Sequence, residues 1–403
     1  MRKRVISVLV LLIALDFAAK ADVVTEASAK ATATLAASKQ PTPHGNRVIA
    51  IAQTAVFEAV NAITKRYPSG NFKLNAPEGA SIPAAVASAT RSALLKFVAS
   101  QKESIENDYQ HAISVIPDGP GKIAGIKLGE EAVEAVLKYR ANDDLAAVET
   151  FRPVTQPGIY VPTAIPVFSV WSKRETWVMT SANQFRPGPP PDLKSEVWAR
   201  DYNEIKSMGV KIGSTRTNEQ TSIASFWETT GATVYLPIVL SVANVQEREV
   251  TQNARLLAIV GQAIDDAIIA VFDAKYTYNF WRPVTAIRNG DIDGNDATER
   301  DPSWTPFIET PMHPEYPCAH CIIASTIGAV LKAELGNAPV PPLTSVSPTA
   351  PGITRRWTTI EDFVREVSEA RICDGVHFRN STEVGTAMGK KIGELATSKF
   401  PIQ

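Results

Sequence analysis

Residues 46–67 read NRVIAIAQTAVFEAVNAITKRY, and this stretch places apolar side chains at the spacing of a helix. The apolar positions form one broad stripe: Val48, Ile51, Ala52, Ala55, Val56, Ala59, Val60 and Ile63. A stripe that returns every three or four residues predicts a helix with one buried face. A helix of this kind must pack against other elements of the chain.

The helical pattern recurs in six further segments: 83–101, 124–139, 253–272, 321–335, 360–371 and 380–397. Strand signals are sparse, because the β-branched run 234–242 is interrupted by Pro237. Long proline-rich connections occupy 152–191 and 338–352, and loops of this length usually have a function or pack over the surface. We therefore predict an all-α fold of one or two helical bundles with long Pro-rich loops.

The chain has 403 residues, of which 44% are hydrophobic, and this is enough for one large domain or two packed halves. We place an N-terminal helical half at 22–250 and a C-terminal half, which carries the motifs described below, at 251–403. The net charge of -1 argues against a nucleic-acid binder, because such proteins carry a basic excess.

Residues 1–21 have the pattern of an export signal. Arg2, Lys3 and Arg4 precede the apolar run 5–15, and Ala19-Lys20-Ala21 offers a cleavage site. No later segment has the roughly 20 apolar residues that a membrane span requires. We therefore predict an exported protein, periplasmic or extracellular, without a membrane span.

Three short blocks carry residues that can bind a ligand or catalyse a reaction. The first runs from Lys275 to Arg282-Pro283. Seven residues are two helical turns, so a helix would place Lys275 and Arg282 on one face. Pro283 is expected to end that element at Arg282.

The second block, 313–320, reads HPEYPCAH and directly precedes an apolar helical run. Proline is favoured in the first turn of a helix, so Pro317 indicates a helix start. The free N–H groups of Cys318, Ala319 and His320 would then form an anion site, which His320 would face.

The third block contains Arg371 and His377, which are six residues apart and would diverge on a straight helix. Gly375 lies between them and offers a helix stop, which would allow both side chains to point to one place. Ser381, one helical turn beyond His377, is expected to hold one ring nitrogen of His377 from outside the anion site.

Together the blocks supply three cations, two histidines and a helix N-terminus. Arginine and lysine suit the oxygens of a tetrahedral oxyanion such as phosphate or vanadate. A neutral histidine nitrogen can attack phosphorus or ligate a metal. We therefore predict one cationic oxyanion pocket between residues 275 and 377.

The order of these blocks resembles the signature of the vanadium-dependent haloperoxidases and type 2 phosphatidic acid phosphatases. That signature is Lys, six residues, Arg-Pro; then Pro-x-x-His; then Arg, five residues, His. It covers roughly the last third of the chain, and residues 47–60 also resemble the first core helix of the soluble haloperoxidase branch.

The resemblance implies a role for each matching residue. Lys275, Arg282 and Arg371 would bind the oxyanion, together with the helix start at Cys318 and Ala319. His377 would be the axial ligand of vanadate, and it would be the nucleophile if the occupant were phosphate. His320 would be the general acid/base, and His313 resembles a second histidine found near the oxyanion in bromoperoxidase-like members.

The sequence departs from the family pattern at the helix start. Pro-Ser-Gly-His of the family is Pro317-Cys318-Ala319-His320 here, so a weaker hydrogen-bond donor replaces serine. The aspartate that often supports the axial histidine has Ser381 in its place. The three cysteines are Cys318, Cys321 and Cys373. The sequence allows a disulfide between Cys321 and either of the other two.

Three functions compete. The first is an exported haloperoxidase-like enzyme that binds vanadate and oxidises halide with hydrogen peroxide. The second is an acid phosphatase that uses the same pocket through a phosphohistidine and binds phosphate esters. The third is a catalytically degenerate oxyanion-binding protein. The sequence leaves open whether the protein forms oligomers.

Overall fold

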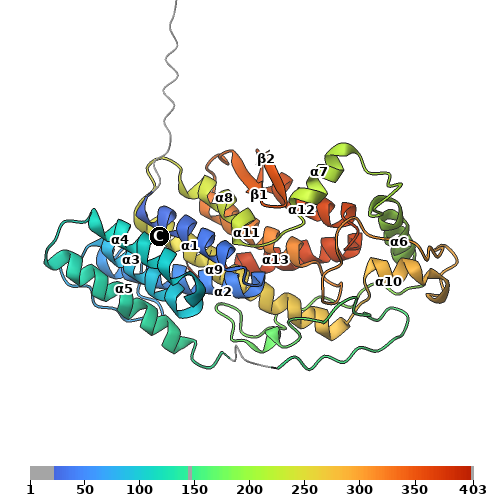
Figure 1. The fold of residues 1–403 in the computed structure, drawn as a ribbon, viewed down its shortest axis with the longest axis horizontal. Coiled ribbons are helices and arrows are strands. Elements are labelled where there is room, and N and C mark those ends of the chain that lie inside the picture. The colour runs from blue at the N-terminus through green and yellow to red at the C-terminus, as the bar shows by residue number, and fades with distance from the viewer. Residues whose placement is uncertain (1–21, 144–147, 401–403) are drawn as a thin grey trace, which may run out of the picture.

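The computed structural model describes residues 22–143 and 148–400, and the predicted signal peptide at 1–21 lies outside these residues. Most described elements are helices, with one antiparallel pair of strands (Figure 1). The elements are α1 (Val23–Ser38), α2 (Thr42–Thr64), α3 (Ile82–Phe97), α4 (Lys102–Ser114), α5 (Pro120–Tyr139), α6 (Glu196–Met208), α7 (Asn218–Phe226), α8 (Ala232–Ala243), α9 (Val250–Tyr278), α10 (Pro283–Arg288), α11 (Ala319–Leu335), β1 (Leu343–Ser347), β2 (Ala350–Trp357), α12 (Ile360–Cys373) and α13 (Arg379–Lys399). The predicted all-α fold class is confirmed.

The core is built around α9, which is buried along most of its length. One continuous hydrophobic cluster joins α9 to α2 on one side and to α11 and α13 on the other. Figure 1 shows α1 to α5 gathered at one end of the molecule and α11 to α13 beyond α9. The apolar stripe that predicted α2 is the surface that packs on α9. In the described part of the chain, no helix is both long and apolar enough to cross a membrane.

Two segments differ from the sequence expectation. Residues 234–242 lie in α8, whose side chains are largely buried, so Pro237 is accommodated within a helix. The proline-rich connection 338–352 contains β1 and the start of β2, which pair as an antiparallel hairpin. β1 packs against α8, so this hairpin covers the helical core and is not a separate sheet layer.

The helices α11 and α13 approach each other closely because α13 places glycines along the contact. A Cβ atom at Gly389 would overlap the main-chain oxygen of Ile322, and one at Gly393 would lie 2.6 Å from that of Thr326. This close packing fixes the first half of α11, which carries the predicted site residue His320, against the middle of α13.

Glu58 in α2 is almost completely buried, and burial raises its pKa to about 7 from an ordinary value of 4.5. A raised carboxyl pKa contributes stability that is complete below pH 4.5 and is lost as pH rises through about 7. This shift corresponds to about 3 kcal/mol. We expect Glu58→Gln to be more stable than the wild type by up to about this amount above pH 7, and equally stable in acid.

Urea unfolding of both proteins across this pH range measures the difference. The control is Glu134→Gln, since Glu134 is an exposed glutamate on α5. A Glu58→Gln advantage that does not grow with pH would contradict the interpretation.

Candidate functional site

The three sequence blocks meet where α9 ends, α10 and α11 begin, and α12 leads into α13. Lys275 occupies the last turn of α9 and is fully buried. Its Nζ donates hydrogen bonds to the carbonyl oxygens of Pro314, at 3.0 Å, and Glu315, at 2.7 Å. Burial holds the pKa of Lys275 well below its usual value, and the neighbouring Arg282 lowers it further.

The sequence prediction that one helix continues to Arg282 is wrong. The helix α9 ends at Tyr278 because Asn279 adopts a left-handed conformation with φ of 48°. Arg282 is instead the N-cap residue of α10, and Pro283 occupies the first turn of that helix, where proline is favoured. The two cations therefore meet through a turn rather than through a shared helical face.

Arg282 is fully buried and connects two predicted catalytic histidines. Its Nε donates to the carbonyl oxygen of His313 at 2.9 Å, and its NH1 donates to that of Val376 at 2.8 Å. The same guanidinium lies 3.0 Å from Nδ1 of His313 and 3.3 Å from Nε2 of His377. Burial lowers the pKa of Arg282 to about 10, which leaves it charged at neutral pH.

His377 is held by a residue to which sequence reasoning gave no role. Oε1 of Glu315 lies 2.7 Å from Nδ1 of His377 and accepts a hydrogen bond from the main-chain N–H of Phe378 at 3.0 Å. The predicted partner, Ser381, has its Oγ 3.4 Å from the same Nδ1. With Nδ1 held by a carboxylate, Nε2 is the nitrogen left for another partner.

Arg371 comes from the last turn of α12 and is paired with a second acidic residue. Its NH1 lies 2.7 Å from a carboxylate oxygen of Asp374 and donates to the carbonyl oxygen of Trp227 at 2.8 Å. The predicted helix stop is present, because α12 ends at Cys373 and Gly375 has a φ of 85°. The main-chain N–H of His377 then bonds the carbonyl oxygen of Arg371 at 3.0 Å, which brings the two residues together.

The predicted helix start is present, but α11 begins at Ala319 and Pro317 lies before its N-cap residue. The main-chain N–H of Cys318 donates to the carbonyl oxygen of Ser381 at 3.1 Å, so the prediction that this N–H is free for an anion is wrong. Cys318 is the N-cap of α11, and its sulfur accepts a hydrogen bond from the main-chain N–H of Cys321 at 3.3 Å. His320 lies in the first turn and is buried. All three cysteines are free thiols, and the sulfurs of Cys318 and Cys321 are 2.7 Å apart.

The three histidines are kept neutral by the same two effects. Burial lowers the pKa of His313, His320 and His377 well below the usual range, and the neighbouring cations lower it further. For His320 the largest charge effect comes from Arg371. The site therefore presents neutral imidazoles, which accept a proton or donate a lone pair, next to charged guanidinium groups.

The site opens onto a cavity of about 360 Å³. The predicted site residues that line it are His313, Ala319, His320, Arg371 and His377. Lys275, Arg282 and Cys318 are not among the lining residues. Part of the wall, Val167 and Phe168, comes from the proline-rich connection 152–191, whose Val167 N–H bonds the carbonyl oxygen of Met312 at 3.0 Å.

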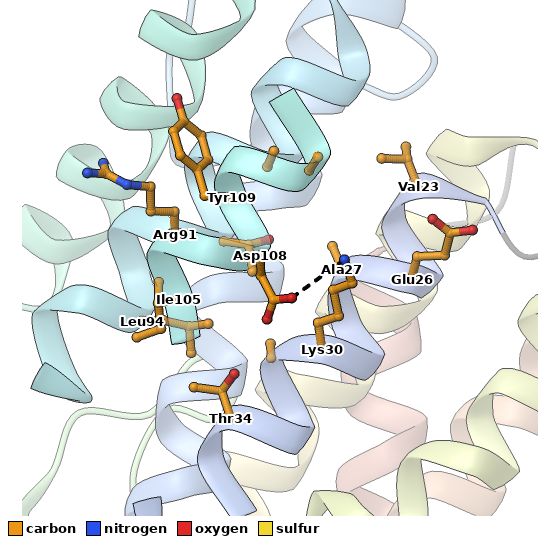
Figure 2. Close-up of a pocket in the computed structure, with 14 residues that line it drawn as sticks. Val23, Glu26, Ala27, Lys30, Thr34, Arg91, Leu94, Ile105, Asp108 and Tyr109 are labelled. Carbon is orange, nitrogen blue, oxygen red and sulfur yellow. Dashed lines mark ion pairs between the residues drawn. The ribbon is translucent and has the colours of Figure 1, made fainter. Parts of the chain in front are cut away.

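A second hollow lies elsewhere, between α1, α3 and α4 (Figure 2). Figure 2 shows an ion pair of Lys30 and Asp108 in it, at 3.7 Å, in which both side chains are 43% exposed. An exposed pair of this kind contributes little binding energy or stability. No predicted site residue lines this hollow.

Two charged residues of the site, Glu315 and Asp374, had no predicted role. Both belong to the blocks that the sequence singles out. The available signal was electrostatic, because three cations are buried together only when acidic groups offset part of their charge. Burial raises the pKa of Glu315 to about 7 and that of Asp374 to about 6, while the adjacent cations act in the opposite direction.

Part of the chain matches a family model, and its fold is similar to solved structures. Residues 255–401 match the family model described as the VCPO second helical-bundle domain. A solved bacterial vanadium-dependent iodoperoxidase is 21% identical, with a TM-score of 0.79 over 94% of this chain and 96% of that one. A bacterial vanadium-dependent chloroperoxidase is 17% identical, with a TM-score of 0.72 over 90% and 94%. No protein of curated function matches the chain.

The fold is thus that of the bacterial vanadium haloperoxidases over nearly the whole described chain. The match of residues 255–401 falls on the part that contains all the predicted site residues. The family-model match and the likeness in fold agree with the resemblance that the order of the three blocks indicated.

Proposed function

We propose that this protein is an exported vanadium-dependent haloperoxidase-like enzyme, which binds vanadate and oxidises halide with hydrogen peroxide. The observation that carries the proposal is the state of His377. Its Nδ1 is held by Glu315, its Nε2 faces Arg282, and the residue lines the cavity. A neutral imidazole whose Nε2 contacts a guanidinium group and no carboxylate suits an oxyanion whose central atom accepts a lone pair.

Two further observations fit an oxyanion. Among the described residues, Nε2 of His320 and Nε of Arg371 are buried polar atoms without a hydrogen-bond partner. Buried polar groups of this kind normally have a partner, and both residues line the cavity. An anion between them would satisfy both atoms, with Arg282 and the N-terminus of α11 adding positive potential.

Bound vanadate would supply a Lewis acid that activates hydrogen peroxide toward attack by halide. The side chains of this chain would do the remaining work. Arg371, Arg282 and Lys275 would offset the negative charge of the anion, and His377 would hold its centre. His320, neutral at its working pH, would accept a proton from peroxide at Nε2 and return it later. His313 would be a second histidine near the anion, next to Arg282.

The alternative is an acid phosphatase that uses the same pocket. The neutral His377 favours it as well, because a free Nε2 can attack phosphorus and Glu315 would stabilise the resulting charge. His320 would then protonate the leaving group. A catalytically degenerate binding protein would have the same pocket and no turnover.

One series of assays separates these functions. The protein is loaded with vanadate, and halide oxidation by peroxide is measured with iodide, bromide and chloride. The proposal predicts turnover that depends on vanadate and is inhibited by phosphate. Turnover of phosphate monoesters with a trapped phosphohistidine would replace it with the phosphatase, and tight oxyanion binding without turnover would replace it with the degenerate protein.

The remaining parts of the proposal concern the whole chain. We propose that residues 1–21 direct export and that the chain divides into helical halves at residue 250. The first is tested by finding whether the mature chain begins at Asp22 in the periplasm or medium. The second is tested by expressing 251–403 alone, which should keep its helices if that half folds independently.

Glu315→Gln is expected to weaken vanadate binding by about 10- to 100-fold, the usual effect of losing the partner of a metal-binding histidine. The amide keeps the size of the side chain but holds Nδ1 of His377 without a charge. Isothermal titration with vanadate measures the change. The matched control is Glu309→Gln, because Glu309 lines the same cavity away from His377 Nδ1. Equal weakening in both variants would contradict a specific role for Glu315.

A further inference from the structure

The start of α11 carries two cysteines in the order Cys318-Ala319-His320-Cys321. Cys318 caps the helix, and Cys321 lies one turn later, so both point to the same place. Their sulfurs are 2.7 Å apart, and the main-chain N–H of Cys321 donates to the sulfur of Cys318. A disulfide bond is about 2.05 Å long, so only a small approach separates these thiols from a bond.

The two thiols have different electrostatic surroundings. Burial raises the pKa of Cys318, but the hydrogen bond from Cys321 and the charge of Arg371 outweigh it, so the pKa lies below the usual value. Burial raises the pKa of Cys321 well above the usual value, and the hydrogen bond it donates to Cys318 raises it further. The thiolate is the reactive form of cysteine, so these surroundings favour Cys318 as the attacking sulfur and Cys321 as the resolving sulfur.

Access to the pair is restricted to small molecules. Cys318 and Cys321 are completely buried, whereas Ala319 and His320 between them line the cavity. Gly385 of α13 closes the other side, since a Cβ atom there would lie 3.2 Å from Cβ of Cys321 and 3.4 Å from Cβ of Cys318. The oxyanion site therefore gives a small oxidant one route to the pair, past Ala319 and His320. A second hollow reaches Ser368, which is hydrogen-bonded to Cys321.

We propose that Cys318 and Cys321 form a reversible dithiol–disulfide pair in the wall of the oxyanion site, oxidised by hydrogen peroxide that enters through the cavity. Hydrogen peroxide is the co-substrate of the proposed function, and this inference rests on that function only for the supply of peroxide. Oxidation or reduction of the pair would act on the main chain of Ala319 and His320. The redox state of the surroundings would thereby affect the wall of the oxyanion site.

The chemistry balances in two steps. The Cys318 thiolate attacks one peroxide oxygen, the O–O bond breaks, and hydroxide leaves, which gives a sulfenic acid. The Cys321 sulfur, having lost its proton, then attacks the Cys318 sulfur, and hydroxide leaves as the S–O bond breaks. The protons of the two thiols convert both hydroxides to water. An external dithiol returns the pair to its reduced form by exchange.

The test uses the full reduced chain, with hydrogen peroxide and without vanadate or halide. After a short exposure, the protein is denatured in an alkylating reagent and digested. The mass of the peptide that contains residues 318–321 is then measured by mass spectrometry. We expect an internal disulfide, two hydrogens lighter than the dithiol, which dithiothreitol reverses. We expect this pair to form at least about tenfold faster than Cys373 is oxidised, because burial raises the pKa of Cys373 to about 12.

Variants assign the roles of the two sulfurs. Cys321→Ser should stop at a sulfenic acid on Cys318, detectable with dimedone, whereas Cys318→Ser should leave Cys321 reduced. Cys373→Ser, the control, should oxidise at the wild-type rate. The proposal is overturned if the wild-type pair keeps both thiols under peroxide, or if Cys321 oxidises equally fast without Cys318. Neither vanadate nor halide is present in this test, so the absence of a disulfide would not count against the haloperoxidase proposal. The absence of halide oxidation would likewise not count against the dithiol–disulfide pair.

Discussion

His377→Ala is expected to abolish specific vanadate binding and to reduce vanadate-dependent halide oxidation by more than about 1000-fold, the upper range for losing one stabilising group. The physical reason is that His377 Nε2 is the one imidazole nitrogen of this residue left free by Glu315, beside Arg282. Alanine removes the lone pair and leaves the buried carboxylate of Glu315 without its imidazole partner. The measurement is a vanadate titration, followed by the halide assay of both proteins at the vanadate concentration that saturates the wild type.

The control for this variant is His111→Ala, since His111 is exposed on α4 and lies outside the cavity. Circular dichroism of both variants shows whether the helices are retained. A folded His377→Ala protein with wild-type vanadate affinity would contradict the role assigned to His377.

Gly389→Ala is expected to destabilise the protein by about 3 kcal/mol, the upper part of the usual range for overpacking a core. The new Cβ would meet the main-chain oxygen of Ile322, and a main-chain atom can move only with the whole of α11. A displaced α11 carries His320 away from His377, so oxyanion affinity should fall together with stability. Chemical unfolding and a vanadate titration measure the two effects.

The matched control is Gly45→Ala in α2, where nothing lies within 4 Å of the added Cβ. This change should be neutral or stabilise by up to about 1 kcal/mol, because alanine favours helix more than glycine does. If Gly389→Ala behaves like Gly45→Ala, the close packing of α11 on α13 is not a constraint on the site.

The sequence predicted the helices that bury a continuous apolar stripe, and the reason is physical. α2 and α9 pack against several neighbours, so their pattern is strong. The helix α7 has only 9 residues, and α4 buries only Ile105, so the apolar periodicity is weak in both. The helix α6 does bury Trp198, Tyr202 and Ile205 at helical spacing, so its signal was present and was missed. The hairpin of β1 and β2 was missed because prolines and exposed residues obscure its alternation.

The site was predicted in its composition better than in its geometry. The cations and histidines follow from residue type and order, since an oxyanion requires them. Their partners do not, because the sequence says nothing about which acid faces which base in space. Glu315 therefore supports His377 more closely than the expected Ser381, and Arg371 is paired with Asp374.

A crystal structure of the protein soaked in vanadate shows whether His377 bonds the centre of the ion. We expect density for vanadate in the cavity, continuous with Nε2 of His377 and in contact with Arg282 and Arg371. Vanadate bound elsewhere, or held in the cavity without a bond to His377, would contradict it.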